Sequence, residues 1–245
     1  ERGIDRTPLF NDCGDNVAKS RDGLFNCAAR FFNISPRFNG CLCNSGYCIL
    51  ERETSFGEVK LIFDAGNPGP PYAMGHAHCD MLSFECFVDG VPWIVNRGTY
   101  AYQDESRLLF KSTSYHNAVQ VEGVEQNECW APFRVARYSK GCILSYSSES
   151  STVVGEMRCT NGSTVRRAIK VGENALRIED KTDDGSQTIS FFAFAGATPS
   201  LSSAERLPDE RYAPEFGACA PIAAFCVHSP TFQVPFDLFG GCPDD

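Results

Sequence analysis

Residues 75–88, with the sequence Gly-His-Ala-His-Cys-Asp-Met-Leu-Ser-Phe-Glu-Cys-Phe-Val, give the clearest indication of how this chain folds. A histidine-containing loop passes here into an apolar, β-prone run, and a turn at Asp89-Gly90 leads into a second such run at residues 92–100. The region closes at residues 112–117, which contain His116. Three of the four histidines therefore lie between residues 75 and 117, beside predicted strands.

Short β-prone runs continue along most of the chain. Tight-turn signals such as Asn161-Gly162 and Asp183-Asp184-Gly185 separate several of them. Strands at short, regular spacing with little helix predict an all-β fold, a large antiparallel β-sandwich of the super-sandwich type with one or two short helices. The expected strands cover residues 46–52, 59–64, 118–121, 131–138, 142–147, 153–159, 164–171, 175–182 and 187–195.

The 245 residues are expected to form a single domain, because β-sandwiches of this length commonly fold as one unit. Residues 1–40 read as a lead-in segment with one short helix within residues 17–32. The loop Asn-Pro-Gly-Pro-Pro at residues 67–71 suits neither a strand nor a helix interior and delivers His76. Residues 200–245, rich in Pro and Gly, predict irregular structure with a few edge strands.

Composition argues against several classes of partner. The chain has 22 basic and 31 acidic residues, a net charge of −9, which disfavours a general binder of nucleic acid or of anionic membranes. No apolar run is long enough to span a bilayer, and no signal-peptide pattern is visible. We therefore expect neither a nucleic-acid partner nor a membrane span.

Thirteen cysteines is a high and odd number. No CxxC pair occurs, so the sequence does not support zinc of the finger type. Cys48, Cys86 and Cys226 stand where a strand would place an apolar side chain, and a buried thiol behaves as a small hydrophobe. We therefore expect mostly buried thiols rather than a disulfide framework.

The central region resembles the heparinase II/III-like family of polysaccharide lyases, specifically its C-terminal β-sandwich domain. The resemblance covers most of residues 8–130, and although a single HxH is a weak signal, the full set in this order and spacing is specific. It rests on Gly75-His76-Ala77-His78-Cys79-Asp80, Leu82-Ser83-Phe84-Glu85, Gly98-Thr99-Tyr100, Ser112-Thr113 and His116-Asn117, and extends to Pro8-Leu9-Phe10 and Leu61-Ile62-Phe63-Asp64-Ala65-Gly66.

The resemblance implies an architecture and a reaction. Family members combine an N-terminal α/α toroid with the β-sandwich and cleave uronate-containing polysaccharides by β-elimination in the cleft between the two. The toroid, which supplies a catalytic tyrosine and an asparagine, is absent from this chain, so the isolated chain is expected to be inactive. The family also suggests a bacterial periplasmic or secreted protein, while the unpaired cysteines leave a cytoplasmic one open.

His76 is the catalytic candidate that the resemblance implies. It matches the sandwich histidine that faces substrate, where imidazole could pair with a uronate carboxylate or move a proton near working pH. The alternative is a loop histidine that only bonds the backbone.

His78 and His116 match positions that hold a structural zinc ion in some members, together with an aspartate at the position of Asn96. Asp80, two residues from His78, could substitute if this segment were a strand. An amide oxygen is a poor zinc ligand, so a buried network of hydrogen bonds among His78, Asn96 and His116 is the alternative. No organic cofactor is expected.

Substrate-binding candidates are basic and aromatic side chains near the same motifs: Arg97, Tyr102, Arg107 and Lys111. Such groups suit an anionic sugar chain, through bidentate contacts to carboxylate or sulfate and through ring stacking. Arg107 and Lys111 could equally be solvated charges on one helix face.

Two classes of function remain. One is the sandwich part of a lyase, for which heparin-like and chondroitin-like glycosaminoglycans and alginate are all open as substrates. The other is a non-catalytic carbohydrate-binding or scaffold module of the same fold. His76 favours the enzyme, whereas Asn96 and the absent toroid favour the module.

Overall fold

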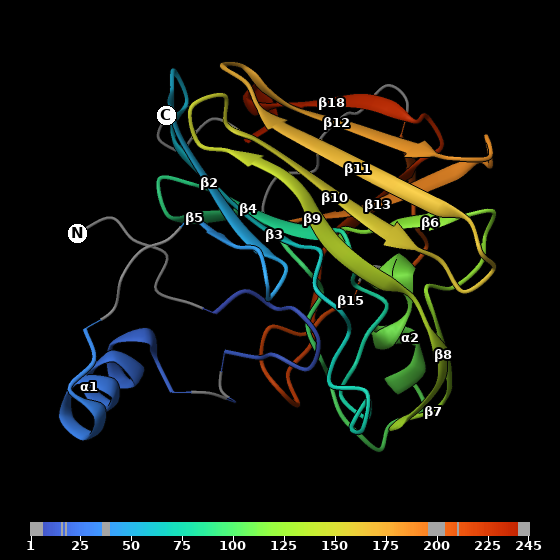
Figure 1. Cartoon of the computed structure of the whole chain (residues 1–245), viewed down its shortest axis with the longest axis horizontal. Helices are drawn as coiled ribbons and strands as arrows, with labels where there is room; N and C mark the ends of the chain where they lie inside the picture. Colours follow the sequence, from blue (N-terminus) through green and yellow to red (C-terminus); the bar gives the residue numbers. More distant parts are fainter. Residues whose placement is uncertain are drawn as a thin grey trace.

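The computed structural model describes residues 7–15, 17, 19–35, 40–195, 204–209 and 211–239, and they form two antiparallel sheets packed face to face (Figure 1). The prediction of an all-β sandwich is confirmed. The larger sheet has the order β1 (Cys41–Leu42), β2 (Tyr47–Thr54), β3 (Gly57–Asp64), β4 (Ser83–Val88), β5 (Val91–Ile94), β13 (Thr188–Phe194), β17 (Ala223–Val227) and β14 (Ala204–Arg206), with β6 (Val119–Val121) also beside β13.

The smaller sheet covers one face of the larger one. Its order is β18 (Thr231–Pro235), β12 (Ala175–Thr182), β11 (Thr164–Val171), β10 (Thr152–Arg158) and β9 (Lys140–Ser147). Burial alternates along β11 and β12, as expected for strands with one face on the core and one in solvent. Val165 and Ile178 of this sheet pack in one hydrophobic core with Phe84 of β4. Both predicted strand ranges, 164–171 and 175–182, agree with the structure.

A buried ion pair stands on the inner face of the smaller sheet. Arg167 donates from Nε and Nη2 to the two carboxylate oxygens of Asp180, each at 2.8 Å, and both side chains are fully buried. Its Nη1 donates to the backbone oxygens of Leu82, at 2.9 Å, and Asn117, at 2.8 Å. Since these two residues end the segments that carry the predicted site, Arg167 fixes those segments to the sandwich.

The C-terminal part is more regular than the composition predicts. The strands β14 and β18 lie at sheet edges, as expected, but β17 is wholly buried between β13 and β14 and pairs Phe225 with Phe192. Proline and glycine at Pro214, Gly217 and Pro221 precede this apolar strand and do not interrupt it. A small separate sheet pairs β15 (Arg211–Tyr212) with β16 (Ala220–Pro221).

Residues 127–138 form a hairpin instead of the single strand predicted at 131–138. Its strands are β7 (Asn127–Ala131) and β8 (Arg134–Tyr138), and Pro132 lies in the turn, because proline cannot donate to a strand ladder. The turn presents Phe133 at the surface, next to His76. The hairpin therefore contributes to the site described below.

Helical structure is short, as predicted. The helix α1 (Arg21–Phe32) begins after Ser20, whose hydroxyl accepts from the Gly23 N–H, and ends at Asn33 in the left-handed conformation. The other helices are α2 (Arg107–Lys111) and the 3-10 turns η1 (Thr113–Tyr115) and η2 (Phe236–Phe239). None of the described helices combines the length and apolar character that crossing a membrane requires.

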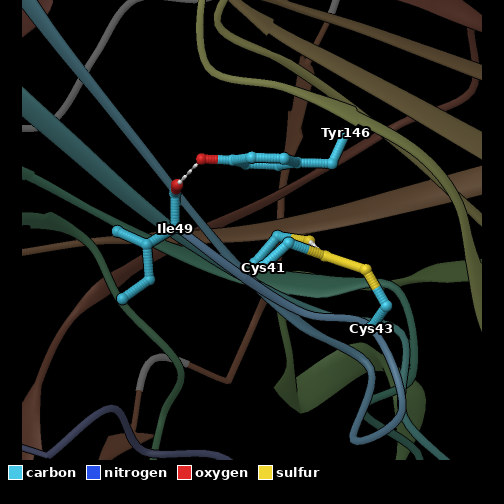
Figure 2. Close-up of a disulfide and its surroundings, with 5 residues drawn as sticks. Cys41, Cys43, Ile49 and Tyr146 are labelled. Carbon is cyan, nitrogen blue, oxygen red and sulfur yellow. Dashed lines mark hydrogen bonds between the residues drawn. A yellow bond between two sulfur atoms is a disulfide. The ribbon is translucent and has the colours of Figure 1, made fainter. Parts of the chain in front are cut away.

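Most described cysteines are free thiols, as expected, and Cys48, Cys86 and Cys226 are buried. The expectation that most thiols are buried is wrong, because Cys79 is the one other buried thiol among the described residues and the rest are partly or fully exposed. The exception to the free thiols is a disulfide between Cys41 and Cys43 at the start of the β1–β2 hairpin. Figure 2 shows this disulfide beside Tyr146 of β9, whose hydroxyl donates to the backbone oxygen of Ile49 at 3.0 Å. The hydrogen bond links the first hairpin of the larger sheet to the smaller sheet.

Candidate functional site

His76 and His78 lie on a loop that ends where β4 begins, and His116 directly follows η1. Residues 76–82 form turns and irregular backbone rather than a strand, so Asp80 does not share a strand face with His78. Asp80 instead accepts a hydrogen bond from the Asn11 N–H at 2.5 Å, and the Asn11 side chain accepts from the His78 N–H at 2.9 Å. The lead-in segment therefore packs directly against the histidine loop.

Asp12 is the centre of the site. Its carboxylate lies 2.7 Å from His76 Nδ1 and 2.7 Å from His78 Nε2, and Arg107 donates to both of its oxygens, from Nη2 at 2.7 Å. Thr99 Oγ1 is 3.3 Å away. Only 6% of the Asp12 side chain is exposed, whereas 65% of His76 is exposed. A buried carboxylate thus holds a histidine that faces solvent.

The charge of Asp12 determines which nitrogens carry protons. Burial alone would raise its pKa, but hydrogen bonds from His78 and Arg107 outweigh burial and hold the pKa of Asp12 well below its usual range. An ionised carboxylate only accepts hydrogen bonds, so His76 Nδ1 and His78 Nε2 must both be donors. His76 therefore directs Nε2, its other ring nitrogen, away from Asp12.

Two buried cations hold the elements around His76 in place. Arg107 and Lys111, on α2, are 1% and 0% exposed, so the alternative of solvated charges is wrong. Lys111 Nζ donates to the backbone oxygens of Gly75 and Pro132, each at 3.1 Å, and burial lowers its pKa. Lys111 thereby joins α2 to the loop before His76 and to the β7–β8 turn.

Aromatic rings surround His76. The rings of Tyr102 and Phe133 each lie 5.6 Å from the imidazole, edge-on, and Phe216 lies 4.9 Å from Tyr102. The Arg107 guanidinium carbon lies 5.1 Å from the Tyr102 ring centroid and 5.6 Å from that of Phe133. Because Phe133 and Phe216 are exposed, they and His76 form one surface on which a sugar ring could stack.

A buried pair of histidines, His78 and His116, adjoins Asp12. His78 Nδ1 is 3.2 Å from His116 Nε2, and both side chains are buried. Burial lowers the pKa of His78. Burial, followed by repulsion between a protonated ring and His78 or Arg97, lowers the pKa of His116 further, so both rings are neutral near pH 7. Since Asp12 holds the proton on His78 Nε2, His78 Nδ1 accepts from His116 Nε2–H.

The side-chain oxygen of Asn96 accepts hydrogen bonds from groups other than the two histidines. Asn96 Oδ1 accepts from the Asn117 N–H at 3.0 Å and from Ser83 Oγ at 2.9 Å, and the backbone donor fixes which way the amide faces. Its Nδ2 is buried without a hydrogen-bond partner among the described residues. An amide nitrogen is not a metal ligand, so His78, His116 and Asn96 do not fit the zinc shell that the resemblance implies.

We expect Asn96→Asp to create zinc binding at His78 and His116. The substitution replaces the partnerless Nδ2 with a carboxylate oxygen, which zinc prefers to an amide. Metal analysis after dialysis against zinc should detect more bound zinc in Asn96→Asp than in the wild type, with a higher melting temperature. Equal zinc content in both proteins would contradict this account of Asn96.

The buried histidines should make stability depend on pH. The unfolded chain protonates its histidines near pH 6.5, whereas the folded pKa values of His78 and His116 are lowered. Their contribution is therefore complete above about pH 6.5 and is lost as the pH falls toward the folded values. Urea unfolding at pH 7 and pH 5 should show a larger loss of stability in the wild type than in His116→Gln. An identical loss in both proteins would contradict neutral burial of His116.

The remaining predicted substrate ligand, Arg97, is buried. It is 2% exposed, donates from Nη1 to the Asp209 backbone oxygen at 2.7 Å and lies 4.2 Å from the Tyr115 ring centroid. These contacts indicate that Arg97 supports the fold. Its buried charge does not face a ligand. Of the four predicted binding residues, only Tyr102 combines partial exposure with a position beside His76.

Sequence reasoning missed Asp12, Phe133 and Phe216. Asp12 lies 64 residues before His76, in a lead-in segment whose turn-like pattern gave no indication of a functional carboxylate. The run Asn11-Asp12, directly after the Pro8-Leu9-Phe10 motif, is the one local signal. Phe133 lies within the strand predicted at residues 131–138 and Phe216 within the region predicted to be irregular, and neither pattern indicates a position beside His76.

Comparisons with known proteins agree with this architecture. The family model "Heparinase II/III-like, C-terminal" matches residues 42–196. Similar solved structures include the heparinase III BT4657 gene product (14% identity, TM-score 0.68, covering 96% of this chain and 42% of that chain). Another is the heparan sulfate lyase HepC from Pedobacter heparinus (13% identity, TM-score 0.63, covering 94% and 41%). A third is heparinase III (14%, 0.66, 95% and 45%).

At these identities the structural likeness concerns the fold alone, and the chain spans less than half the length of these solved proteins. The comparison with curated proteins found no match. The family match nevertheless covers more than half of the 245 residues and includes the entire histidine motif. The chain therefore belongs to the heparinase II/III-like family, of which it carries the C-terminal domain.

Proposed function

We propose that this chain is the β-sandwich part of a polysaccharide lyase that cleaves a uronate-containing polysaccharide by β-elimination, with His76 facing the substrate. The observation that carries the proposal is the pairing of an exposed imidazole with the buried, ionised Asp12. A surface histidine with no functional role would not need a buried, ionised carboxylate to fix the orientation of its ring.

The proposed reaction breaks two bonds in the uronate and the chain attached to it. A base removes the proton at C5, the electron pair forms a C4–C5 double bond, and the oxygen at C4 leaves and takes up a proton. The family resemblance gives the base role to a tyrosine of the toroid. Negative charge develops on the uronate carboxyl group as the C5 proton is lost, so a nearby donor stabilises the transition state.

His76 suits that donor role. With Nδ1–H held by Asp12, Nε2 is the nitrogen left to meet the substrate. A protonated Nε2 could bond the uronate carboxylate and strengthen that bond as the enolate forms. His76 would then act on the reacting group, while Asp12 would act through His76 as a positioning residue.

Sugar binding is assigned to the aromatic surface. Tyr102, Phe133 and Phe216 offer ring faces and edges near His76, and the family includes proteins named for heparin and heparan sulfate. Stacking would position a pyranose ring, and the charges that select an anionic chain would come in part from the toroid side. The substrate class proposed is therefore an anionic, uronate-containing polysaccharide.

A non-catalytic binding module is the second candidate, because the same aromatic surface could hold a sugar chain without any reaction. Asn96, in place of the aspartate of the zinc-binding members, is the observation that favours it. The two functions differ in one product: only the lyase generates a C4–C5 unsaturated uronate.

The test uses the full-length protein that contains this chain. Incubation with heparan sulfate, chondroitin sulfate and alginate should yield an ultraviolet-absorbing unsaturated uronate from at least one of them. Binding in a glycan array or by calorimetry without any such product would overturn the lyase and leave the binding module. Absence of both binding and product would overturn both candidates.

A further inference from the structure

Three potential metal ligands meet at the edge of the larger sheet, remote in sequence from the histidine motif. Glu205 of the edge strand β14 is paired directly opposite Cys226 of β17, and His228 follows two residues later. His228 is the first residue after β17, and its side chain lies beside that of Cys226. The three ligand atoms, one sulfur, one nitrogen and one oxygen, all lie within 4.8 Å of one another.

The spacing is close to that of a coordination shell. Cys226 Sγ is 3.8 Å from His228 Nε2, and His228 Nε2 is 3.9 Å from Glu205 Oε2. Ligand atoms about 2.0–2.3 Å from one tetrahedral zinc ion lie roughly 3.3–3.6 Å apart. Small rotations would close the difference, and they are available because the side chains of Glu205 and His228 are 76% and 62% exposed.

We infer that Glu205, Cys226 and His228 form a binding site for a zinc-class divalent transition metal. Thiolate and imidazole prefer zinc, cobalt or copper to magnesium or calcium, which take oxygen ligands. Binding would transfer the Cys226 thiol proton to solvent, and the resulting thiolate and carboxylate would balance the charge of the ion. Three protein ligands leave the fourth position to water or to a small ligand.

The position of the site suggests what the ion would do. The strand β14 has three residues and pairs only with β17 among the described strands, so a metal bridging Glu205 to Cys226 and His228 would fasten this edge. His228 also lines a cavity of about 540 Å³ with Asp180, Gln187 and Thr188. The inference does not depend on the lyase proposal.

The test is metal binding by the full chain, freed of metal by a chelator and kept reduced with a phosphine. Dialysis against Zn²⁺ should leave about one equivalent bound, and Co²⁺ should produce a thiolate-to-cobalt charge-transfer band. Cys226→Ser should abolish that band, and His228→Ala and Glu205→Gln should each weaken binding roughly tenfold or more, the scale on which even outer-shell substitutions act. The last two replace exposed side chains, so their folding should be unaffected.

Controls separate this site from the other donors of the chain. Cys142→Ser removes an exposed cysteine outside the cluster and should leave the cobalt band unchanged. His116→Gln removes the buried histidine pair and should also leave it unchanged. Wild-type protein without bound metal, or a cobalt band that survives in both Cys226→Ser and His228→Ala, would overturn the site.

Discussion

Replacing His76 with alanine in the full-length protein is expected to lower kcat by roughly 100-fold or more, the scale of a positioned acid-base or electrostatic group. The loss should fall on kcat more than on KM, because the bond from His76 to the carboxyl group strengthens as charge develops. The aromatic surface of Tyr102 and Phe133 is untouched and should preserve most of the substrate binding.

The measurement is the initial rate of ultraviolet absorbance from the unsaturated product. Lys170→Ala, an exposed substitution on the smaller sheet, is the matched control and should retain wild-type turnover. A His76→Ala enzyme as fast as the wild type would remove His76 from the mechanism while leaving the lyase proposal in place. A loss confined to KM would make His76 a binding residue only.

Replacing Asp180 with alanine is expected to lower the free energy of unfolding by about 3–5 kcal/mol, as when one partner of a buried ion pair is removed. Arg167 would lose both carboxylate bonds and remain fully buried. The charge would then depend on its remaining bonds to Ser190 Oγ and to the backbone of Leu82 and Asn117. The histidine segments should loosen together with the core.

Urea unfolding measures the free energy of unfolding of Asp180→Ala and of its control, Glu179→Ala, each against the wild type. Glu179 is the preceding residue on β12 and bonds the exposed Lys181, a surface pair whose removal should cost no more than about 1 kcal/mol. If Asp180→Ala lost no more stability than Glu179→Ala, the buried pair would not be supporting the fold.

Local patterns predicted the sandwich because each strand is visible in a short window. The alternation of buried and exposed residues in β11 and β12, bounded by turns such as Asn161-Gly162, needs no distant information. The hairpin at residues 127–138 and the buried β17 were missed for opposite reasons. The pattern of residues 131–138 predicts one strand across Pro132, which instead lies in the β7–β8 turn. The prolines before β17 predict irregular structure, but that irregular segment ends where β17 begins.

The site was predictable only in part. The motif identified His76, His78 and His116 as a group. The structure places His78 Nδ1 3.2 Å from His116 Nε2. The burial of Arg107 and Lys111 could not be read from a five-residue helix, because it results from the loop and hairpin that pack over them. Asp12 reaches its partners only through tertiary packing.

The contact between Asp12 and His76 gives the most direct test of the central claim, that these two residues act as one unit. The measurement is kcat for the full-length wild type, Asp12→Asn, His76→Ala and the double variant, after equal melting temperatures have shown that each is folded. Asp12→Asn should lower kcat at least about tenfold, because a neutral amide no longer holds Nδ1–H as the carboxylate does and the ring loses its orientation. Adding it to His76→Ala should then change kcat by no more than about twofold. If the two losses instead multiply in the double variant, Asp12 does not act through His76 and the account is contradicted.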